Sequence, residues 1–505
     1  MKRFIICAVL ISIAVIASTS ARTRGCGPIF ITQDDIPYQI TKNGRYHLCE
    51  DVQFNGTGSD SAITIEASNV QLILEGHSIT LQGSDIFGIK VSDVSEILIS
   101  NDSIQTDPSF NNGTAIQLSN TQKVQLSNLC ISNSTLGLQI IDSTDVYVYN
   151  CSFSHCDDGM RISRGNSITL DHTTINHSVA NGLVLRNAKD LKIFKSSFFD
   201  AGDILVSASN DCANFLVKDS SFTQTTTLTN FSVLDLRVRN LAIDQCSFTC
   251  ATGVSNAIMQ YGRETGLSIN SSLFEAPSST NNCIDLDIGS SSILIRGCTI
   301  NGSPASSGIA LTSGNASIQE TVIKNCLNGI HLRRNSEGIS IDRCTINNNL
   351  GNGILIERAH YNAVTNNSIC KNAANGILLT AASVFGNVIK NNTVADNTLN
   401  GISLEGADSN TVLNNEVCGN IGNGIVLNNS SLQNSVQYNR VHNNVGIGIF
   451  DNDLSFNNGN QIYYNTSHTN TGLEYSIDPA TTFIQAQGDT TLEASNINGD
   501  LPFIP

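Results

Sequence analysis

Residues 328–332 read NGIHL, and this five-residue unit returns at closely similar intervals along the chain. The later copies are NGILI at 352–356, NGILL at 375–379, NGISL at 400–404 and NGIVL at 423–427. Their glycines are 24, 23, 25 and 23 residues apart, and Gly448 follows after another 24. Self-similarity at a fixed short period is the signature of a repeat architecture. The sequence therefore predicts a stack of small structural units in place of several separate globular domains.

The repeat continues toward the N-terminus in a degraded form. From Ala62 to Gly448 there are 16 steps over 386 residues, a mean of about 24. Only the step from Asp203 to Val233, at 30 residues, is clearly out of register, and we interpret TQTTTLTN at Thr223–Asn230 as an inserted loop. The upstream anchor positions are Ala62, Gly88, Gly113, Gly137, Gly159, Gly182, Asp203, Val233, Ala257, Cys283 and Gly308.

Each repeat contains two stretches in which apolar and polar residues alternate. The first follows the anchor, and the second comes about ten residues later, as in SILIRGCTI at 292–300 and GISIDRCTI at 338–346. Alternation with a period of two is typical of strands, and no window shows the 3.6 period of a helix. A unit this short cannot bury its apolar face alone, so we expect coils stacked about 4.8 Å apart with parallel strand pairing. A leucine-rich repeat has a similar period but requires a fixed leucine framework that these units lack.

The composition limits the class of protein. The 505 residues carry 27 basic and 43 acidic side chains, a net charge of −16, and charged residues make up only 14% of the chain. A disordered chain combines low hydrophobicity with high charge, whereas here 40% of the residues are hydrophobic. No basic stripe offsets the acidic balance, which argues against a nucleic-acid partner.

The N-terminus has the pattern of a cleaved secretory signal over residues 1–21. Lys2 and Arg3 precede an apolar run from Phe4 to Ile16, and small residues lead to Ala21. The run is too short to span a bilayer comfortably, although an N-terminal anchor remains an alternative. No later segment approaches a membrane span. We expect a protein that is secreted or located in the cell envelope, in the periplasm or outside the cell.

The two ends of the chain lack the repeat. We expect an N-terminal cap over 22–57, in which ITKNGRYHLCEDV at 40–52 looks like a hairpin, a β-helix over 58–468, and a C-terminal cap or tail over 469–505. Cys26 and Cys49 both fall in the first cap and are the best candidates for a disulfide in an oxidising compartment.

Most other cysteines fit an interior position. Four of them occupy one slot, C-[ST]-[FI], in different repeats, and a stacked slot facing the core suits cysteine as a small hydrophobic residue. No closely spaced Cys/His set is present, so a zinc site is not expected. The four are Cys151, Cys246, Cys298 and Cys344.

Charged residues gather at the outward positions of three neighbouring repeats. Counting from the anchor, positions one and three face inward, so positions two and four face outward. Asp285 and Asp287, then His331 and Arg333, and then Glu357 occupy those outward positions. We expect Arg333 and Glu357 to be cross-strand neighbours, and Asp287 to lie two coils from Arg333 with Thr312 between them. Arg334 and Arg358 come just beyond the same strands.

The Gly-Ile-x-Leu units and the turns in NAVTNNSI at 362–369 and GNVIKNNTV at 386–394 resemble those of the right-handed parallel β-helix. The resemblance is to the carbohydrate-binding and sugar-hydrolase repeat class, which shares the pectin-lyase-like fold, and it runs from about Ala62 to Ser467. It implies an all-β chain forming one right-handed parallel β-helix of about 17 coils, capped at both ends. The class includes lyases, hydrolases, epimerases, copper-loading periplasmic proteins and non-catalytic binders, so it implies a polysaccharide or cell-surface glycan partner but no particular reaction.

Under this resemblance the charged residues have two catalytic interpretations. In a lyase or C5-epimerase, Arg333, helped by Arg334 or Arg358, would hold a uronate carboxylate while His331 or Glu357 abstracts the neighbouring proton. In a hydrolase, Asp285 or Asp287 would work with Glu357 as proton donor and base. The same charges also suit a solvated ladder that keeps the sheet soluble, in which case the chain is a non-catalytic adhesion or structural rod. The candidates for substrate binding are Asp285, Arg334 and Arg358.

A second candidate site is CDDGMRISRGN at 156–166. Asp157 and Asp158, with Arg161 on the following strand, resemble the paired aspartates of polygalacturonases, although the Gly-His-Gly and Arg-Ile-Lys marks of that family are absent. Asp-Asp before Gly is also ordinary turn chemistry.

Turn carboxylates and amides would suit Ca²⁺. With only three methionines, one of them the initiator, a copper role is not expected, and no other cofactor is implied. We expect a monomer.

Overall fold

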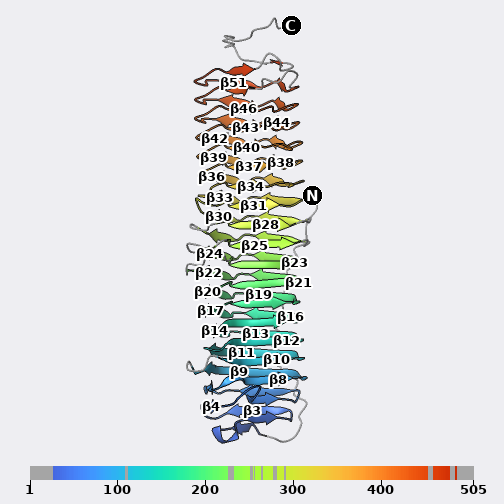
Figure 1. Ribbon diagram of the computed structural model, residues 1–505, viewed down its shortest axis with the longest axis vertical. Helices are drawn as coiled ribbons and strands as arrows, with labels where there is room; N and C mark the ends of the chain where they lie inside the picture. The colour runs from blue at the N-terminus through green and yellow to red at the C-terminus, as the bar shows by residue number, and fades with distance from the viewer. Residues whose placement is uncertain are drawn as a thin grey trace.

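The structure is a computed structural model that describes residues 27–107, 112–225, 232–250, 254, 256–262, 266–276, 281–288, 292–452, 459–477 and 484–485. The chain winds as a single right-handed parallel β-helix into a long rod, with the first strands at one end and the last strands at the other (Figure 1). The expected all-β class and the expected number of about 17 coils are confirmed. The predicted signal, residues 1–21, lies outside the described residues.

Each coil contributes to three parallel ladders, which we call ladders A, B and C. Ladder A holds the strand after each anchor residue. Its strands are β2 (Tyr38–Ile40), β5 (Ser61–Ile65), β8 (Ser84–Ser92), β10 (Asn112–Ser119), β12 (Leu136–Ile141), β15 (Asp158–Ser163), β18 (Leu183–Arg186), β21 (Val206–Lys218), β23 (Leu234–Asp244), β25 (Ile258–Gly262), β28 (Ile284–Ile288), β31 (Ile309–Thr312), β34 (Ile330–Leu332), β37 (Ile354–Glu357), β40 (Ile377–Thr380), β43 (Ile402–Glu405), β46 (Ile425–Asn428), β49 (Ile449–Asp451) and β52 (Tyr475–Ile477).

Ladder B follows in each coil, and the long strands β21 and β23 pass from ladder A into it. Its other strands are β1 (Ile29–Ile31), β3 (Gly44–Leu48), β6 (Val70–Ile73), β9 (Ser95–Thr106), β11 (Gln122–Ser132), β13 (Thr144–Tyr149), β16 (Asn166–Asp171), β19 (Lys189–Phe194), β26 (Leu267–Asn270), β29 (Ile293–Arg296), β32 (Ala316–Gln319), β35 (Ser340–Asp342), β38 (Ala363–Thr365), β41 (Val388–Lys390), β44 (Thr411–Leu413), β47 (Ser435–Gln437), β50 (Gln461–Tyr463) and β53 (Ile484–Gln485).

Ladder C closes each coil, and β9 and β11 extend into it from ladder B. Its other strands are β4 (Val52–Phe54), β7 (Ile79–Leu81), β14 (Ser152–Ser154), β17 (Thr174–Ser178), β20 (Ser197–Ala201), β22 (Ser221–Gln224), β24 (Ser247–Cys250), β27 (Leu273–Glu275), β30 (Thr299–Asn301), β33 (Val322–Lys324), β36 (Thr345–Asn347), β39 (Ser368–Cys370), β42 (Thr393–Ala395), β45 (Glu416–Cys418), β48 (Arg440–His442) and β51 (Thr466–His468). A short 3₁₀ helix, Gln33–Asp35, follows β1.

The third ladder was not predicted. The stretch 292–300 reads as one alternation in the sequence, but it contains two strands, β29 and β30, separated by Gly297. Gly297 has a φ of +62°, a left-handed conformation that turns the chain by a corner between the two strands. Arg343 takes the same conformation, with a φ of +52°, at the equivalent corner of a later coil.

Two anchor positions in the sequence interpretation are wrong by two residues. Ile116 pairs with Ile89, which makes Ala115 the anchor in place of Gly113. Val206 pairs with Leu183, which likewise makes Leu205 the anchor in place of Asp203. In both coils the strand alternation, not the turn residue before it, determines which residue faces the core.

Other expectations for this region and for the N-terminus also change. Thr223 and Gln224, expected in an inserted loop, belong to β22, and the Gln224 amide donates to the carbonyl oxygen of Ala201 at 2.9 Å. The expected hairpin at 40–52 is wrong, because β3 pairs in parallel with β6, and β4 in parallel with β7. The predicted Cys26–Cys49 disulfide stays a prediction, since Cys26 lies outside the described residues and Cys49 is exposed.

The glycines of the repeated unit are required by space. A Cβ on Gly376 would lie 2.3 Å from Cγ1 of Val394 and 2.6 Å from the carbonyl oxygen of Gly401. The same collision recurs in the next coil, where a Cβ on Gly401 would lie 2.3 Å from Cγ1 of Val417. The anchor position, at the end of the corner where ladder C returns to ladder A, therefore has no room for a side chain in these coils, which explains the glycine there.

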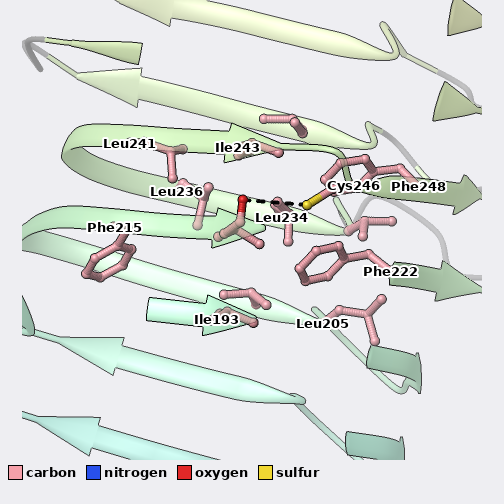
Figure 2. Packing of buried hydrophobic residues seen from close by; sticks show 14 of the residues in the cluster. Ile193, Leu205, Phe215, Phe222, Leu234, Leu236, Leu241, Ile243, Cys246 and Phe248 are labelled. Atoms are coloured by element: carbon pink, nitrogen blue, oxygen red, sulfur yellow. Dashed lines mark hydrogen bonds between the residues drawn. The ribbon is translucent and has the colours of Figure 1, made fainter. Parts of the chain in front are cut away.

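Phenylalanine fills the core of the middle coils. Phe198, Phe222, Phe248 and Phe274 are fully buried on ladder C. Their rings stack in one column, with centroids 4.9, 5.0 and 4.7 Å apart. Figure 2 shows Phe222 and Phe248 packed among aliphatic side chains of ladders A and B.

The cysteines of the repeated slot lie in the interior, as predicted. The thiol of Cys246 donates to the carbonyl oxygen of Val217 in the preceding coil, and Cys298 and Cys344 make equivalent bonds (Figure 2 for Cys246). Burial raises the pKa of each of these thiols to about 11. They are therefore protonated and inert at neutral pH.

Asparagine replaces these residues in the C-terminal coils and forms interior columns at all three corners. In the column with Asn392, its Oδ1 accepts the backbone N–H and the side-chain amide of Asn367 from the preceding coil. Its own side-chain amide donates to Val364 O and to Oδ1 of Asn415 in the following coil. Each asparagine with a column neighbour on both sides thus bonds to the coil before it and to the coil after it. The three columns are Asn362, Asn387, Asn410, Asn434 and Asn460; Asn367, Asn392, Asn415, Asn439 and Asn465; and Asn349, Asn372, Asn397, Asn420, Asn444 and Asn470.

Candidate functional site

The charged residues predicted on the repeated strands lie on the outer face of ladder A. Ile330 and Leu332 of β34 are fully buried, whereas His331 between them is partly exposed. The outward row through His331 continues to Ala310 and Asp285 in the two preceding coils. The predicted inward and outward positions are therefore confirmed for this part of the ladder.

Arg333 forms an ion pair with Asp285, two coils away. Its Nη2 lies 2.5 Å from Oδ1 and its Nη1 lies 3.4 Å from Oδ2. The outward position between the two coils belongs to Ala310, whose small side chain lets the guanidinium reach across β31. Asn282 holds the carboxylate from the other side, with its amide 2.7 Å from Oδ2. The Nε atom of Arg333 is buried and makes no hydrogen bond within the described structure.

His331 pairs with Glu357 of the following coil. The distance from Nε2 of His331 to Oε2 of Glu357 is 3.0 Å, and the imidazole side chain is 20% exposed. Burial lowers the pKa of His331 below its usual value of 6.5, and Arg333 acts in the same direction, whereas Glu357 and Asp285 oppose the shift. His331 is therefore neutral at pH 7. When Nε2–H donates to the carboxylate, Nδ1 keeps a lone pair and is a proton acceptor.

The register places Arg333 opposite Glu357, as expected, because Leu332 pairs with Ile356. The polar contacts are different ones: Glu357 bonds to His331, and Arg333 pairs with Asp285. Asp287 is exposed and faces Thr312, as expected from the register. The side chains of Asp287, Arg334 and Arg358 form no hydrogen bond or ion pair with the described residues, and both arginines are exposed. Of the seven candidate residues, the structure thus brings together Asp285, His331, Arg333 and Glu357. Two further cations, Arg334 and Arg358, have no ionic partner among the described residues.

A titration of His331 tests these electrostatics without any substrate. Removing the charge of Glu357 with Glu357→Gln is expected to lower the pKa of His331 further, and removing the cation with Arg333→Ala is expected to raise it. Because the unfolded chain takes up this proton more readily, His331 also lowers stability as the pH falls from 6.5. NMR titration of the imidazole signals measures both shifts. Shifts of the same sign in the two variants would contradict this electrostatic account.

The stretches of sequence between ladder C and ladder A are longest close to Asp285. Nine residues separate β22 from β23, seven separate β24 from β25, and eight separate β27 from β28. In later coils the stretches comprise five residues before β34 (325–329) and six before β37 (348–353). A surface hollow of about 670 Å³ lies elsewhere in the described structure, at the corner between ladders B and C around Lys195, Asp219 and Gln245.

The second candidate site is occupied by internal contacts. Asp158 is buried, its Oδ2 lies 2.5 Å from Nη2 of Arg161, and its Oδ1 accepts the side-chain amide of Asn181 at 3.1 Å. Burial, and then the neighbouring Asp158, raises the pKa of Asp157. Because both oxygens of Asp158 are engaged, these residues hold one coil to the next and do not form an open carboxylate pair.

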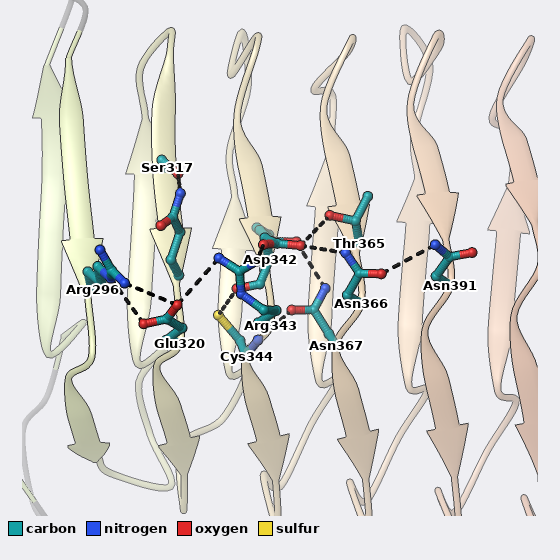
Figure 3. Close-up of polar contacts among 12 residues, drawn as sticks. Arg296, Ser317, Glu320, Asp342, Arg343, Cys344, Thr365, Asn366, Asn367 and Asn391 are labelled. Carbon is teal, nitrogen blue, oxygen red and sulfur yellow. Dashed lines mark hydrogen bonds and ion pairs between the residues drawn. The ribbon is translucent and has the colours of Figure 1, made fainter. Parts of the chain in front are cut away.

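A charged group on ladder B was missed by the sequence interpretation. Glu320 bonds both Nε and Nη2 of Arg296, at 3.0 and 3.2 Å, and also contacts Arg343 at 3.3 Å (Figure 3). Asp342 continues the group to Thr365 and Asn366. Glu320 and Arg343 occupy the corner position between ladders B and C, where the φ angle is positive, so the alternation of apolar residues gave no signal for them. These exposed ion pairs provide a control for the group on ladder A.

Three family models match parts of the chain. A model described as right handed beta helix region matches residues 40–222 and 114–274. A model described as rhamnogalacturonase A/epimerase, pectate lyase-like, matches residues 200–355. A model described as periplasmic copper-binding protein (NosD) matches residues 290–499. No curated protein sequence matches the chain.

Solved structures of β-helix proteins are also similar. The periplasmic alginate epimerase AlgG is 12% identical, with 84% of each chain covered and a TM-score of 0.24. The A-module of mannuronan C-5 epimerase AlgE4 from Azotobacter vinelandii is 11% identical, with 88% of this chain and 91% of that chain covered and a TM-score of 0.23. The tailspike protein of E. coli bacteriophage HK620 is 11% identical, with 81% and 72% covered and a TM-score of 0.33.

The residues of this chain do not fit a copper centre. Copper is held by clustered soft or imidazole ligands, and the segment 290–499 contains no methionine. Among the described residues, no group of three or more His, Cys, Asp or Glu side chains is arranged to hold a metal ion. The described part of the chain also contains no helix long and apolar enough to cross a bilayer.

The family matches overlap and together run from residue 40 to residue 499, and the described strands of the three parallel ladders run from Ile29 to Gln485. The chain is a right-handed parallel β-helix repeat protein of the pectin-lyase-like class.

Proposed function

We propose that the outer face of ladder A around Arg333 binds an acidic polysaccharide and that His331 removes a proton from the carbon next to a uronate carboxylate. The observation that carries this proposal is the pair formed by His331 and Glu357, in which a neutral imidazole is held by a carboxylate 3.0 Å away. A base held in its neutral form at pH 7, and oriented by an acceptor, suits proton abstraction.

The neighbouring residues supply the charge that this step needs. Abstraction leaves negative charge on the uronate carboxylate, which becomes enolate-like, and the proton passes to Nδ1 of His331 while Glu357 stabilises the imidazolium. The partly exposed guanidinium of Arg333 and the exposed cations Arg334 and Arg358 are the donors available for that carboxylate. They also provide local positive charge on a chain whose net charge is −16.

The carbanion then has two fates. Expulsion of the oxygen on the adjacent carbon breaks the glycosidic bond and leaves an unsaturated end, which is a lyase reaction. Return of a proton to the opposite face inverts the carbon, which is a C5-epimerase reaction. Hydrolysis requires a protonated carboxylic acid as donor, and in this structure Asp285 bonds to Arg333 and Glu357 to His331. These contacts favour elimination or epimerisation over hydrolysis.

The comparisons support a polysaccharide as the ligand. The pectate lyase-like model matches residues 200–355 and so includes Asp285, His331 and Arg333. The predicted signal at 1–21 and the match to a periplasmic protein family favour an action in the cell envelope or outside the cell.

The test is incubation of the full chain with alginate, polygalacturonate and a neutral glucan, with products read by ultraviolet absorbance of unsaturated ends and by proton NMR of inverted uronates. His331→Gln is expected to reduce the rate on the acidic polymer at least about 100-fold. Arg333→Ala is expected to raise KM more strongly than it lowers kcat. The matched control is Arg343→Ala, which removes an arginine from an ion pair on ladder B and is expected to leave both parameters unchanged.

Each outcome separates the candidate functions. Product formation that survives in His331→Gln contradicts the assigned base. Retention of the acidic polymer without any product, lost in Arg333→Ala, makes the chain a non-catalytic binding rod. The absence of both product and retention contradicts the proposal as a whole.

A further inference from the structure

A line of exposed apolar side chains runs along one corner of the C-terminal coils. Six consecutive coils place an apolar residue at the corner where ladder C returns to ladder A, and we call these residues the apolar ridge. Five of them are among the most exposed large apolar side chains of the described structure, at 41–59% exposure. The ridge consists of Leu327, Leu350, Ala373, Leu399, Ile421 and Val445.

Each corner of the ridge bonds to the corner of the preceding coil. The backbone N–H of Leu350 donates to Cys326 O, that of Ile421 donates to Asn397 O, and that of Val445 donates to Asn420 O. In the coil between Ala373 and Ile421 the position in register is Thr398, whose N–H donates to Asn372 O, and Leu399 follows it by one residue. Five steps of about 4.8 Å give a length of roughly 24 Å. Single exposed apolar residues are ordinary, but a contiguous row of them marks an interaction surface.

The surface beside the ridge carries little charge. The preceding row on the surface, separated from the ridge by the buried column of Cys326 and Asn349 to Asn444, is Asn325, Asn348, Lys371, Asp396, Gly419 and Asn443. Among these only Lys371 and Asp396 are charged, they have opposite signs, and neither forms an ion pair within the described structure. On a chain with a net charge of −16, this is a place where a second copy can approach without strong repulsion.

The arrangement of these residues is self-complementary. The midpoint of the six ridge coils falls between the coil of Ala373 and the coil of Leu399, which are also the coils of Lys371 and Asp396. A two-fold axis through that midpoint, perpendicular to the rod, makes two rods antiparallel and keeps each row opposite its own equivalent. Lys371 of each copy then faces the Asp396 position of the other copy, so the cross-copy ion pair forms twice.

The same axis matches the apolar residues. Leu327 faces the Val445 position of the second copy, and Leu350 faces the Ile421 position. A parallel arrangement would place the charged row opposite a row of asparagines and would form neither ion pair. From this pattern we infer that two copies of the chain associate antiparallel through the apolar ridge of the C-terminal coils, in contrast to the monomer expected from the sequence.

Sedimentation velocity of the full chain over a range of concentrations tests this inference. The wild type is expected to show a concentration-dependent dimer, and Ile421→Asp is expected to weaken dimerisation at least about 100-fold, because it places a charge against the apolar side chain of Leu350 in the second copy. The matched control is Val179→Asp, since Val179 occupies the same corner in an earlier coil, is 66% exposed and lies outside the ridge. This control is expected to dimerise like the wild type.

A charge exchange tests the antiparallel register. Lys371→Asp sets two carboxylates against each other and is expected to weaken the dimer about tenfold, whereas the double change of Lys371→Asp with Asp396→Lys is expected to restore it. Both positions have the same left-handed backbone, so either residue type is already accommodated there. A wild-type chain that stays monomeric, a dimer unaffected by Ile421→Asp, or a double variant no better than Lys371→Asp would each overturn the inference.

Discussion

Replacing Phe222 with alanine is expected to lower the free energy of unfolding by about 4 kcal/mol. The ring is fully buried on ladder C, with the rings of Phe198 and Phe248 stacked on its two sides at 4.9 and 5.0 Å. Its loss removes apolar contact in three consecutive coils at once. The cavity cannot close, because each backbone neighbour is fixed by parallel pairing on both sides. The midpoint of urea unfolding, followed by circular dichroism, measures the effect.

The control for this experiment is Phe199→Ala in the adjacent position. Phe199 faces outward and is only half-buried, with an edge contact to His177 at 5.2 Å. Its removal is expected to cost less than about 1 kcal/mol. Equal losses from the two variants would show that the stacked column contributes nothing beyond ordinary apolar burial.

Asn392→Ala is expected to cost about 3 kcal/mol, although it removes a polar side chain. The change leaves the backbone N–H and the side-chain amide of Asn367 without their acceptor, and Val364 O without its donor, all inside the rod. A buried polar group that has lost its partner keeps the full penalty of its desolvation, whereas the apolar replacement offers no hydrogen bond in return. Urea unfolding measures the loss of stability, and faster hydrogen exchange at the Asn367 amide locates it.

The neighbouring Asn391→Gly is the matched control. Asn391 is exposed, donates to Asn366 at 3.3 Å, and has a φ of +56°, which glycine adopts without strain. Its replacement is expected to change stability by less than about 1 kcal/mol. If Asn392→Ala proved as mild as Asn391→Gly, the buried columns would be a consequence of the repeat and not a source of its stability.

The fold was predictable because its signal repeats. The Gly-Ile-x-Leu unit identified the inward positions of ladder A, and the glycine itself follows from the lack of space around Gly376 and Gly401. The third ladder was not visible, since strands as short as β30 and β36 merge with the preceding strand into one alternation. The anchors at Gly113 and Asp203 were misplaced because a turn residue two positions earlier imitates the repeat when the true anchors are Ala115 and Leu205.

The candidate site was predictable only as a set of outward positions. The period gave the face shared by Asp285, His331 and Glu357, but not which side chains meet. Arg333 does not bond to its nearest register neighbours. It reaches diagonally over Ala310 to Asp285, a contact that depends on the length of the arginine side chain and on the small residue in the coil between them. The charged group on ladder B was not predicted, because Glu320 and Arg343 lie at corners, where the alternation of a strand does not determine which way a side chain points.

The asparagine columns also bear on how such a rod changes length. From Asn372 to Asn397, Asn420 and Asn444 the same residue returns after 25, 23 and 24 positions, with the same partners above and below. Excision or duplication of one complete turn in this region joins surfaces that already match, so gene segments of this size can be lost or gained without disturbing the interior. Removal of a segment of any other length would put the asparagines of all three columns out of register with their partners in the next coil. The coil with Asp285 contributes no residue to these columns and the coil with Arg333 contributes only Asn349, so whole turns can be exchanged in the C-terminal coils while the charged face stays unchanged.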